Sequence, residues 1–239
     1  MAYGTVNADL IATSTTGGTL GAGNATGFKN RIINGAMMID QRNAGASVTI
    51  PAAVTYTLDR WYAYGSAASK FSVQQNAGSV TPPIGFTNYL GCTSLSSYSF
   101  SSGESYRIHQ AIEGYNVADF GWGTANAKTI TISFWVYSSL TGSFGASLYN
   151  DDATRSYPFN YTISSANTWT QISVTVPGDT SGTWNKTNSG GIKLQFSLGA
   201  GSTLLASSSS WSSTLYFGLT GTTSVVGTSG ATFYITGVQ

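Results

Sequence analysis

Apolar and polar residues alternate with a period of two along most of this chain. The stretch from Lys128 to Tyr137, KTITISFWVY, places four apolar side chains on one side: Ile130, Ile132, Phe134 and Val136. Polar and aromatic residues fill the positions between them. Because successive side chains of a strand point to opposite faces, this pattern predicts a β-strand with one core-facing side.

The same alternation recurs in shorter runs that are separated by turn residues. Five clear runs are Phe144 to Leu148, Tyr157 to Ile163, Ile172 to Val176, Ile192 to Leu198, and Phe233 to Ile235. Shorter candidates are Arg60 to Tyr64, Phe71 to Gln75, Tyr89 to Leu95, and Tyr106 to Glu113. Turn signals such as Pro177-Gly178-Asp179 bound them, and only Val117 to Gly121 favours a helical turn. About ten strands without a βαβ rhythm or a fixed repeat predict an all-β, antiparallel jelly-roll β-sandwich.

The first 27 residues differ from the rest in pattern. Val6 and Leu10 belong to a weak alternation, and the run from Thr13 to Gly27 offers only Leu20 as an apolar anchor. Such a segment buries too little surface to fold alone. We therefore expect an extended arm over residues 1–27, followed by the sandwich over residues 28–239. Val6, Leu10 and Leu20 are its candidate contacts for attachment to another protein or to a neighbouring subunit, and a loose terminus is the alternative.

The stretch KNRIINGAMMIDQRNAG, from Lys29 to Gly45, is interpreted as the junction between this arm and the first strand. Asn34 and Gly35 predict a turn, and three apolar residues around it are expected to anchor in the core: Ile33, Met37 and Ile39.

Two arginines of the junction are candidate assembly residues. Arg31 and Arg42 are expected to pair with carboxylates such as Asp40 or Asp59, or to contact a neighbouring subunit.

The composition narrows the classes of partner. Charged residues are only 8% of the chain and the net charge is +1, so the basic surface of a duplex-binding protein is missing and nucleic acid is not an expected partner. The single cysteine, Cys92, cannot form an internal disulfide and is interpreted as a small core residue. No apolar run is long enough to span a membrane and no signal-peptide pattern begins the sequence, so synthesis in a cytoplasm without membrane insertion is expected.

The sequence holds no convincing catalytic set. A glycosidase needs two carboxyl groups about 5 to 10 Å apart. Glu104 with Glu113, or Asp151 with Asp179, are the pairs that one would propose. The only histidine, His109, lacks a nucleophile elbow nearby and is expected at the surface or at an interface. We therefore expect no enzymatic activity.

Three of the six tryptophans are candidate glycan contacts. Trp122, Trp184 and Trp211 lie in Gly- or Ser-rich surroundings (GWGTA, GTWNKTN and SSWSS), and Asn185 is an adjacent polar group. Flat rings next to amides and hydroxyls suit the apolar faces and hydroxyls of sugars. The alternative is that these rings cap the open ends of the sandwich or pack between subunits.

Calcium is the remaining ligand with some chemical support. Asn150, Asp151, Asp152 and Asp179 supply hard oxygens, but their spacing matches no known calcium loop. Asp151, Asp152 and Asp179 are therefore weak metal candidates. We expect neither a bound metal nor a cofactor.

Five motifs in a fixed order carry a family resemblance. They are KNRIINGAMMIDQRNAG, YTLDRW (Tyr56 to Trp61), IHQAIEGYNVADFGWGTANAKTITISFWVYSSLTG (Ile108 to Gly142), GDTSGTW (Gly178 to Trp184) and the closing FYITGVQ. Together they resemble a family of bacteriophage virion surface proteins, of the tail fibre, receptor-binding or capsid-decoration type. The segment from Ile108 to Leu140 also looks like jelly-roll carbohydrate-binding modules.

This resemblance implies a non-enzymatic structural protein on the surface of the virion. The first expectation is a capsid decoration or head fibre with glycan adhesion, and the alternatives are a tail fibre that recognises host carbohydrate and a polysaccharide-degrading enzyme. The implied partners are other virion proteins of the capsid or tail, further copies of the chain (a trimer being one candidate) and host cell-surface glycans. The resemblance fixes no ligand residue.

Overall fold

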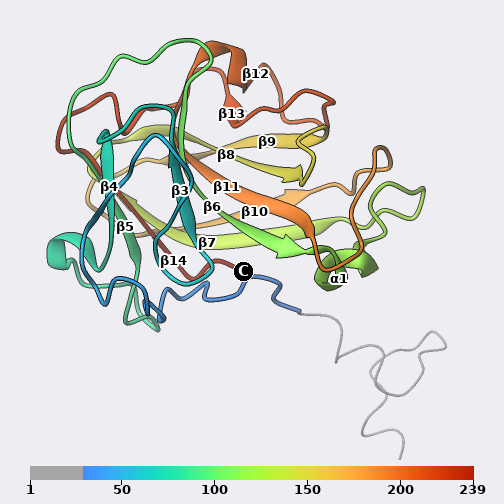
Figure 1. Cartoon of the computed structure of the whole chain (residues 1–239), viewed down its shortest axis with the longest axis horizontal. Helices are drawn as coiled ribbons and strands as arrows, with labels where there is room; N and C mark the ends of the chain where they lie inside the picture. The colour runs from blue at the N-terminus through green and yellow to red at the C-terminus, as the bar shows by residue number, and fades with distance from the viewer. Residues whose placement is uncertain (1–28) are drawn as a thin grey trace, which may run out of the picture. The chain divides into compact units, whose positions relative to one another are not determined.

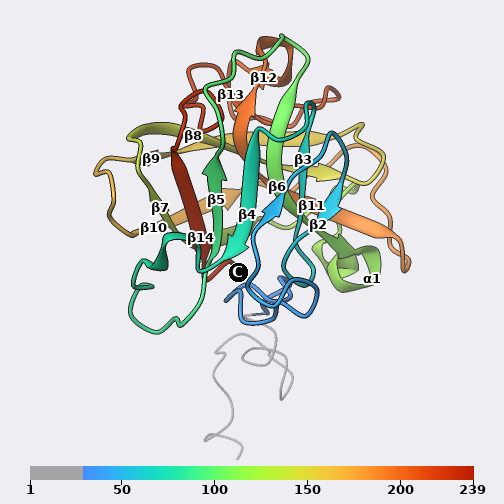
Figure 2. The ribbon, with the colours of Figure 1, turned by 60° about the vertical axis from the view of Figure 1, so that its left-hand side comes forward.

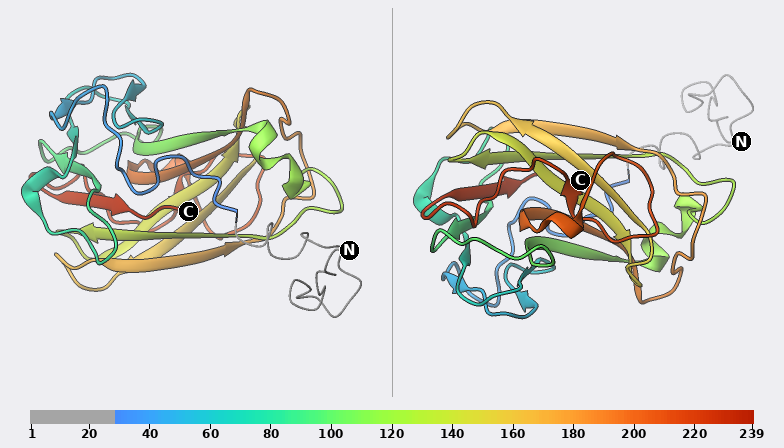
Figure 3. Two further views of the ribbon diagram at one scale, coloured as in Figure 1. Left: turned by 90° about the horizontal axis from the view of Figure 1, so that it is seen from below. Right: turned by 90° about the horizontal axis from the view of Figure 1, so that it is seen from above.

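The alternating runs of the sequence form two antiparallel sheets that pack face to face. The computed structural model describes residues 29–239, and the two layers are seen edge-on in Figure 3. In order across the first sheet, the strands are β1 (Val48–Thr49), β4 (Phe71–Gln75), β5 (Leu90–Ser94), β14 (Thr232–Thr236), β7 (Ile130–Ser138) and β10 (Thr170–Val176). In the second sheet they are β2 (Thr55–Tyr56), β3 (Tyr62–Gly65), β6 (Ser105–Glu113), β11 (Gly190–Ala200), β8 (Gly142–Asn150) and β9 (Ser156–Ile163) (Figure 1). The predicted jelly-roll β-sandwich is confirmed.

A few short elements connect the strands. A third, two-stranded parallel sheet joins β12 (Leu205–Ala206) to β13 (Gly218–Leu219). The helical segments of the described residues are η2 (Ala77–Ser79), α1 (Gly114–Val117), η3 (Ala118–Phe120) and η4 (Ser202–Leu204). The helical turn predicted at Val117 to Gly121 is confirmed as η3, and α1 precedes it directly at the end of β6.

The period-two pattern predicted the long strands and missed the short ones. In β7 the buried side chains are Ile132, Phe134 and Val136, as the alternation requires. Residues 29–239 contain fourteen strands rather than about ten, because β1, β2, β12 and β13 have two residues each. A strand of two residues is too short to show a period.

Aromatic rings join the two sheets across the core. Phe134 of the first sheet and Phe196 of the second are fully buried and meet edge to face, with ring centroids 4.9 Å apart. Tyr161 lies 5.0 Å from Phe134 on its other side. Cys92 is fully buried, as expected of a core residue, and burial raises the pKa of its thiol.

The predicted arm, residues 1–27, lies outside the described residues, together with its candidate contacts Val6, Leu10 and Leu20. Contacts divide the chain after Arg31, and the unit from Ile32 to Gln239 contains the whole sandwich.

The junction loop folds around Asn34. Its side-chain amide donates to the carbonyl oxygens of Ile39 and Asp59, and its Oδ1 accepts the N–H of Ile39, at 2.9 to 3.0 Å. The predicted turn is therefore confirmed, and Met37 is fully buried. Ile33 and Ile39 are 45% and 47% exposed, so the expectation that they anchor in the core is wrong. The loop closed by Asn34 turns only Met37 inward.

The carboxylates of Asp40 and Asp59 bind backbone N–H groups of the junction. The carboxylate of Asp40 accepts the backbone N–H groups of Asn43 and Gly45, and that of Asp59 accepts the N–H of Gln41. The guanidinium of Arg42 lies 5.1 Å from the centre of the Tyr56 ring. Arg42 is thus placed at the surface of the second sheet.

We expect Phe196→Ala to lower the free energy of unfolding by about 3–5 kcal/mol, because it leaves a cavity between two sheets that cannot close around it. Ile84→Ala, at a fully exposed position, should change it by less than about 0.5 kcal/mol. Urea denaturation of the two variants measures both values, and a loss below about 1 kcal/mol for Phe196→Ala would contradict this role.

Candidate functional site

The outer face of the second sheet carries an unusual set of polar and aromatic side chains. In β6 the apolar Ile108 and Ile112 point into the core, so Arg107, His109 and Glu113 point to the opposite face. The register pairs His109 with Tyr62 of β3 and with Gln195 of β11. This face therefore presents hydrogen-bonding groups across three neighbouring strands.

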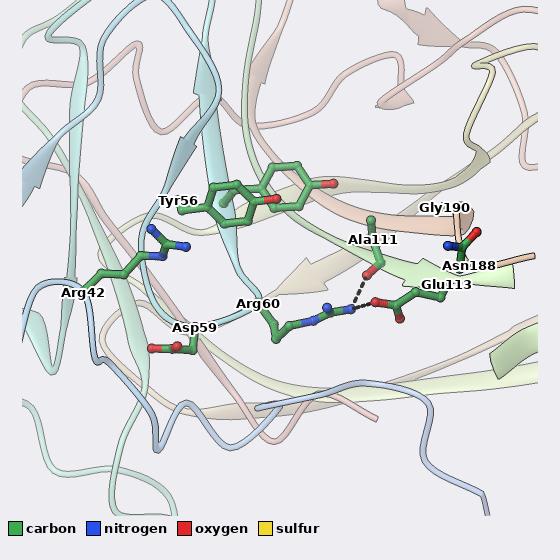
Figure 4. Close-up of a pocket in the computed structure, with 9 residues that line it drawn as sticks. Arg42, Tyr56, Asp59, Arg60, Ala111, Glu113, Asn188 and Gly190 are labelled. Atoms are coloured by element: carbon green, nitrogen blue, oxygen red, sulfur yellow. Dashed lines mark hydrogen bonds and ion pairs between the residues drawn. The ribbon is translucent and has the colours of Figure 1, made fainter. Parts of the chain in front are cut away.

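A hollow of about 400 Å³ lies on this face, near the end of β6 that leads into α1. Its lining residues are Arg42, Tyr56, Asp59, Arg60, Tyr62, Ala111, Glu113, Asn188 and Gly190 (Figure 4). Small-molecule sites commonly measure about 300–1,000 Å³, so this hollow is of the size that a small ligand needs. We call it the tyrosine pocket.

Two tyrosines give the pocket its apolar surface. Tyr56 and Tyr62 are direct cross-strand neighbours on β2 and β3, and their ring centroids are 5.3 Å apart. Tyr62 is 9% exposed and its ring meets His109 at 3.6 Å, whereas Tyr56 is 53% exposed because it lies on a short edge strand. Burial raises the pKa of Tyr62, and the nearby Tyr149 raises it further, so its hydroxyl stays protonated. One ring is thus held firmly, and the other is open to a ligand.

Charged groups of both signs border these rings. Arg60 donates to the Glu113 carboxylate at 2.6 Å and to the carbonyl oxygen of Ala111 at 3.2 Å. Partial burial opposes ionisation of Glu113, but hydrogen bonds from its own backbone N–H and from Arg60 outweigh it, and the pKa is lowered. Together with Arg42 and Asp59, the pocket holds two guanidinium groups and two carboxylates. Such a site is neutral overall and rich in donors and acceptors.

The three tryptophans predicted to bind glycan do come together, but mostly inside the protein. The ring centroids of Trp122, Trp184 and Trp211 lie 4.8 to 5.4 Å apart, in edge-to-face contacts. Trp122 is 3% exposed and Trp184 is 8% exposed, while Trp211 is half-buried. The expectation that Trp122 and Trp184 offer open ring faces is therefore wrong.

Each indole of this cluster is also tied to the backbone. The N–H of Trp122 donates to the carbonyl oxygen of Lys128, that of Trp184 to Ser181, and that of Trp211 to Pro177. Asn185 is half-buried, and its side-chain oxygen accepts hydrogen bonds from Thr187. This arrangement agrees with the alternative to glycan contact, in which the tryptophan rings cap an end of the sandwich.

Two of the three weak metal candidates, Asp151 and Asp179, are used in ion pairs. The Arg155 guanidinium binds both oxygens of Asp179 at 2.7 Å, and Asp179 is only 2% exposed. Asp151 pairs with Lys193 at 2.7 Å, and Asp152 is exposed. Within residues 29–239, no group of three or more His, Cys, Asp or Glu side chains could hold a metal ion.

Of the two carboxylate pairs proposed for a glycosidase, the strand separates one, and the members of the other bind different cations. Glu104 lies just before β6 and Glu113 ends it, so about nine residues of extended chain, roughly 30 Å, separate them. Asp151 and Asp179 bind different cations, Lys193 and Arg155. Asp59 and Glu113 instead share the tyrosine pocket, a pairing that the sequence analysis did not consider.

His109 points to the outer face, as its position in the strand predicts, but it is only 3% exposed. The ring of Tyr62 covers it. Burial, together with the charges of Arg107 and Lys193, keeps its pKa well below the usual value, so the imidazole is neutral. The expectation of a surface histidine is wrong because a side chain from the next strand lies over it.

The sequence analysis missed most of the pocket, although its motifs contain a signal. The KNRIINGAMMIDQRNAG motif contributes Arg42, and YTLDRW contributes Tyr56, Asp59 and Arg60. The motif from Ile108 to Gly142 contributes Ala111 and Glu113. Three of the five motifs therefore meet at one place on the surface.

No helix within the described part of the chain is long and apolar enough to cross a membrane.

We expect the Arg60–Glu113 pair to make stability depend on pH. Because the pKa of folded Glu113 lies below its usual value of 4.5, the pair stabilises the protein above about pH 4.5, and this stabilisation is lost as the pH falls through the folded pKa. The difference in unfolding free energy between wild type and Glu113→Gln should shrink toward acid pH. Arg60→Gln, which removes the partner, should abolish most of that pH dependence, and denaturation curves between about pH 7 and pH 3 measure both. A difference that stays constant over this range would contradict the assignment.

Comparison with known proteins gives structural likenesses only. No family model matches the sequence, and no curated protein matches it. One similar structure is the enzymatically active domain of tailspike protein 4 from bacteriophage CBA120, with 12% identity and a TM-score of 0.42; the match covers 87% of this chain and 21% of that one. This chain therefore spans about a fifth of that structure.

A putative sugar-binding protein from Bacteroides thetaiotaomicron matches with 12% identity and a TM-score of 0.49. The match covers 88% of this chain and 98% of that one. A family 11 carbohydrate-binding module from Clostridium thermocellum matches with 12% identity, a TM-score of 0.38 and 80% and 93% coverage. Likenesses this remote transfer no ligand or activity to this protein.

Proposed function

We propose that this protein is a non-enzymatic glycan-binding protein displayed on the surface of a bacteriophage particle. The observation that carries the glycan part is the tyrosine pocket, in which the exposed Tyr56 ring lies next to Tyr62 and is bordered by Arg42, Arg60 and Glu113. A sugar offers apolar C–H faces and a rim of hydroxyl groups. An open aromatic ring packs against the first, and guanidinium and carboxylate groups hydrogen-bond the second.

The virion part of the proposal rests on the resemblance of the five sequence motifs. Three of those motifs deliver residues to the tyrosine pocket, which links the resemblance to a surface feature. Synthesis in the host cytoplasm and assembly with other virion proteins belong to this proposal. Display of many copies, or of an oligomer, would multiply the weak binding of one small pocket.

Binding without catalysis is favoured by the protonation state of the pocket. A glycosidase needs one carboxyl group that keeps its proton until it donates it to the leaving group. Glu113 has a lowered pKa and is held by Arg60, so it is an ionised acceptor. The alternative, a polysaccharide-degrading enzyme, would need two carboxylates in one pocket. Asp59 and Glu113 meet that single requirement.

We expect Tyr56→Ala to lower the affinity for a bound glycan about tenfold, because it removes the open stacking surface of the pocket. The exposed ring makes a small contribution to folding, so the variant should keep wild-type stability. The measurement uses the biotinylated protein, made multivalent on streptavidin, on an array of bacterial polysaccharides. Leu95→Ala, at an exposed position beside the first sheet, is the matched control and should bind like wild type.

Absence of any array signal for the multivalent protein would overturn glycan binding. New reducing ends in a polysaccharide incubated with the protein would establish the enzyme instead. If Tyr56→Ala leaves the array signal unchanged, the glycan binds outside the tyrosine pocket.

Labelling of intact particles tests the location. We expect gold-labelled antibodies against residues 32–239 to bind the head of the particle, as a capsid decoration or head fibre would require. Labelling confined to the tail would establish the alternative, a tail fibre. Absence of labelling on particles that are decorated by a control antibody against the major capsid protein would contradict virion display.

A further inference from the structure

A single segment covers the part of the second sheet's outer face that lies beside the tyrosine pocket. Residues 202–220, which we call the strap, include η4, β12 and β13 (Figure 2) and contact β8, β9 and β11. The Gln195 side chain donates to the carbonyl oxygen of Phe217 at 2.8 Å, and Leu219 N–H donates to Asn160 Oδ1 at 3.0 Å. Near its middle, Ser212 and Ser156 exchange backbone hydrogen bonds of 2.9 and 3.0 Å. The strap is thus hydrogen-bonded to β11 and β9, the two strands on either side of β8.

Rings and a buried cation fix the strap in place. Phe217 is 3% exposed and lies against Tyr149 of β8, with ring centroids 6.1 Å apart. The guanidinium carbon of Arg107 lies between two rings, 4.3 Å from the centre of Tyr64 and 4.4 Å from that of Phe217. Trp211, within the strap, packs on Trp122 and Trp184. Lifting the strap would expose these groups together, so it is a fixed wall and not a loop that opens readily.

The cross-strand register shows where this wall meets the pocket. Tyr62 of the pocket pairs with His109 on β6, and His109 pairs with Gln195 on β11. Gln195 is already bonded to the strap and is fully buried. The pocket therefore lies over β2, β3, the end of β6 and Gly190 at the start of β11, and the strap closes the face from Gln195 of β11 onward. Because neighbouring strands lie about 4.8 Å apart, the open part spans roughly 10 Å from β2 to β6.

An ion pair closes the pocket beside the strap. Lys193 pairs with Asp151 at 2.7 Å and lies 5.7 Å from the centre of the Tyr149 ring. A Cβ atom on Gly190, which lines the pocket, would lie 2.6 Å from Asp151 Oδ1. The ion pair therefore fills the space between the pocket and the covered Tyr149.

We propose that the tyrosine pocket takes the end of a glycan chain, and not a segment from its middle. This inference rests on the proposed glycan-binding function. An internal segment of a polysaccharide must enter a site and leave it again, and across the sheet the strap blocks the way out. A chain end needs only one entrance, which the side of β2 with the exposed Tyr56 provides. The volume of about 400 Å³ fits a short terminal segment.

The test is an inhibition experiment with wild-type protein, so it depends on no variant of the strap. An array-positive bacterial polysaccharide is cut by mild acid into fractions of decreasing mean length. Each fraction competes for binding of the protein to the immobilised intact polymer. For a site that binds chain ends, a fraction with tenfold shorter chains carries tenfold more ends per unit mass and should inhibit at about one tenth of the mass concentration.

The outcomes separate this inference from the function on which it rests. Inhibition per unit mass that stays constant or weakens as the chains shorten, with binding still lost in Tyr56→Ala, overturns end recognition and leaves glycan binding intact. No binding to the intact polymers, or binding that Tyr56→Ala leaves unchanged, overturns the proposed function and end recognition with it. Leu95→Ala should follow wild type at every chain length.

Discussion

The whole structure depends on the packing of two sheets against a shared aromatic core. The edge-to-face contact of Phe134 with Phe196 lies in this core. The chain has one cysteine and therefore no internal disulfide to join the sheets. Trp61, Phe144 and Phe233 extend the same buried layer along the sandwich. Each strand must therefore keep its register, because a shift by one residue would turn its apolar side chains away from the core.

The polar parts of the protein are consequences of that register. Once Ile108 and Ile112 are fixed in the core, His109 and Glu113 have to lie on the outer face. There the second sheet is divided into two parts by the strap. On the covered side, Tyr149 and Phe217 bury a small second core. On the open side, the exposed ring of Tyr56 lies beside the buried ring of Tyr62.

The fate of the tryptophans shows why composition is a poor guide to a binding surface. Gly- and Ser-rich surroundings place Trp122, Trp184 and Trp211 in loops, as the sequence analysis assumed. Loops that come from three distant parts of the chain converge at one end of the sandwich, and their rings pack on one another. Both carboxylate oxygens of the buried Asp179 bind the guanidinium of Arg155, and one of them also accepts a hydrogen bond from the Trp184 indole N–H. Rings that look suited to a ligand are thus used to close the fold.

The sequence by itself determined the long strands and the sandwich, because the alternation of apolar residues in stretches such as Ile130 to Val136 reports directly which side of a strand is buried. It also indicated the turn at Asn34, whose side chain bonds within a few residues. It did not determine β1, β2, β12 and β13, which are too short to carry a period. The first two form where a longer strand pairs with them, and β12 and β13 pair with each other. Nor did it determine the tyrosine pocket, whose residues come from β2, β3, β6, the start of β11 and the loops between strands. Exposure of Tyr56, burial of His109 and closure by the strap follow from which segments lie over one another in space, and that was decided only by the tertiary structure.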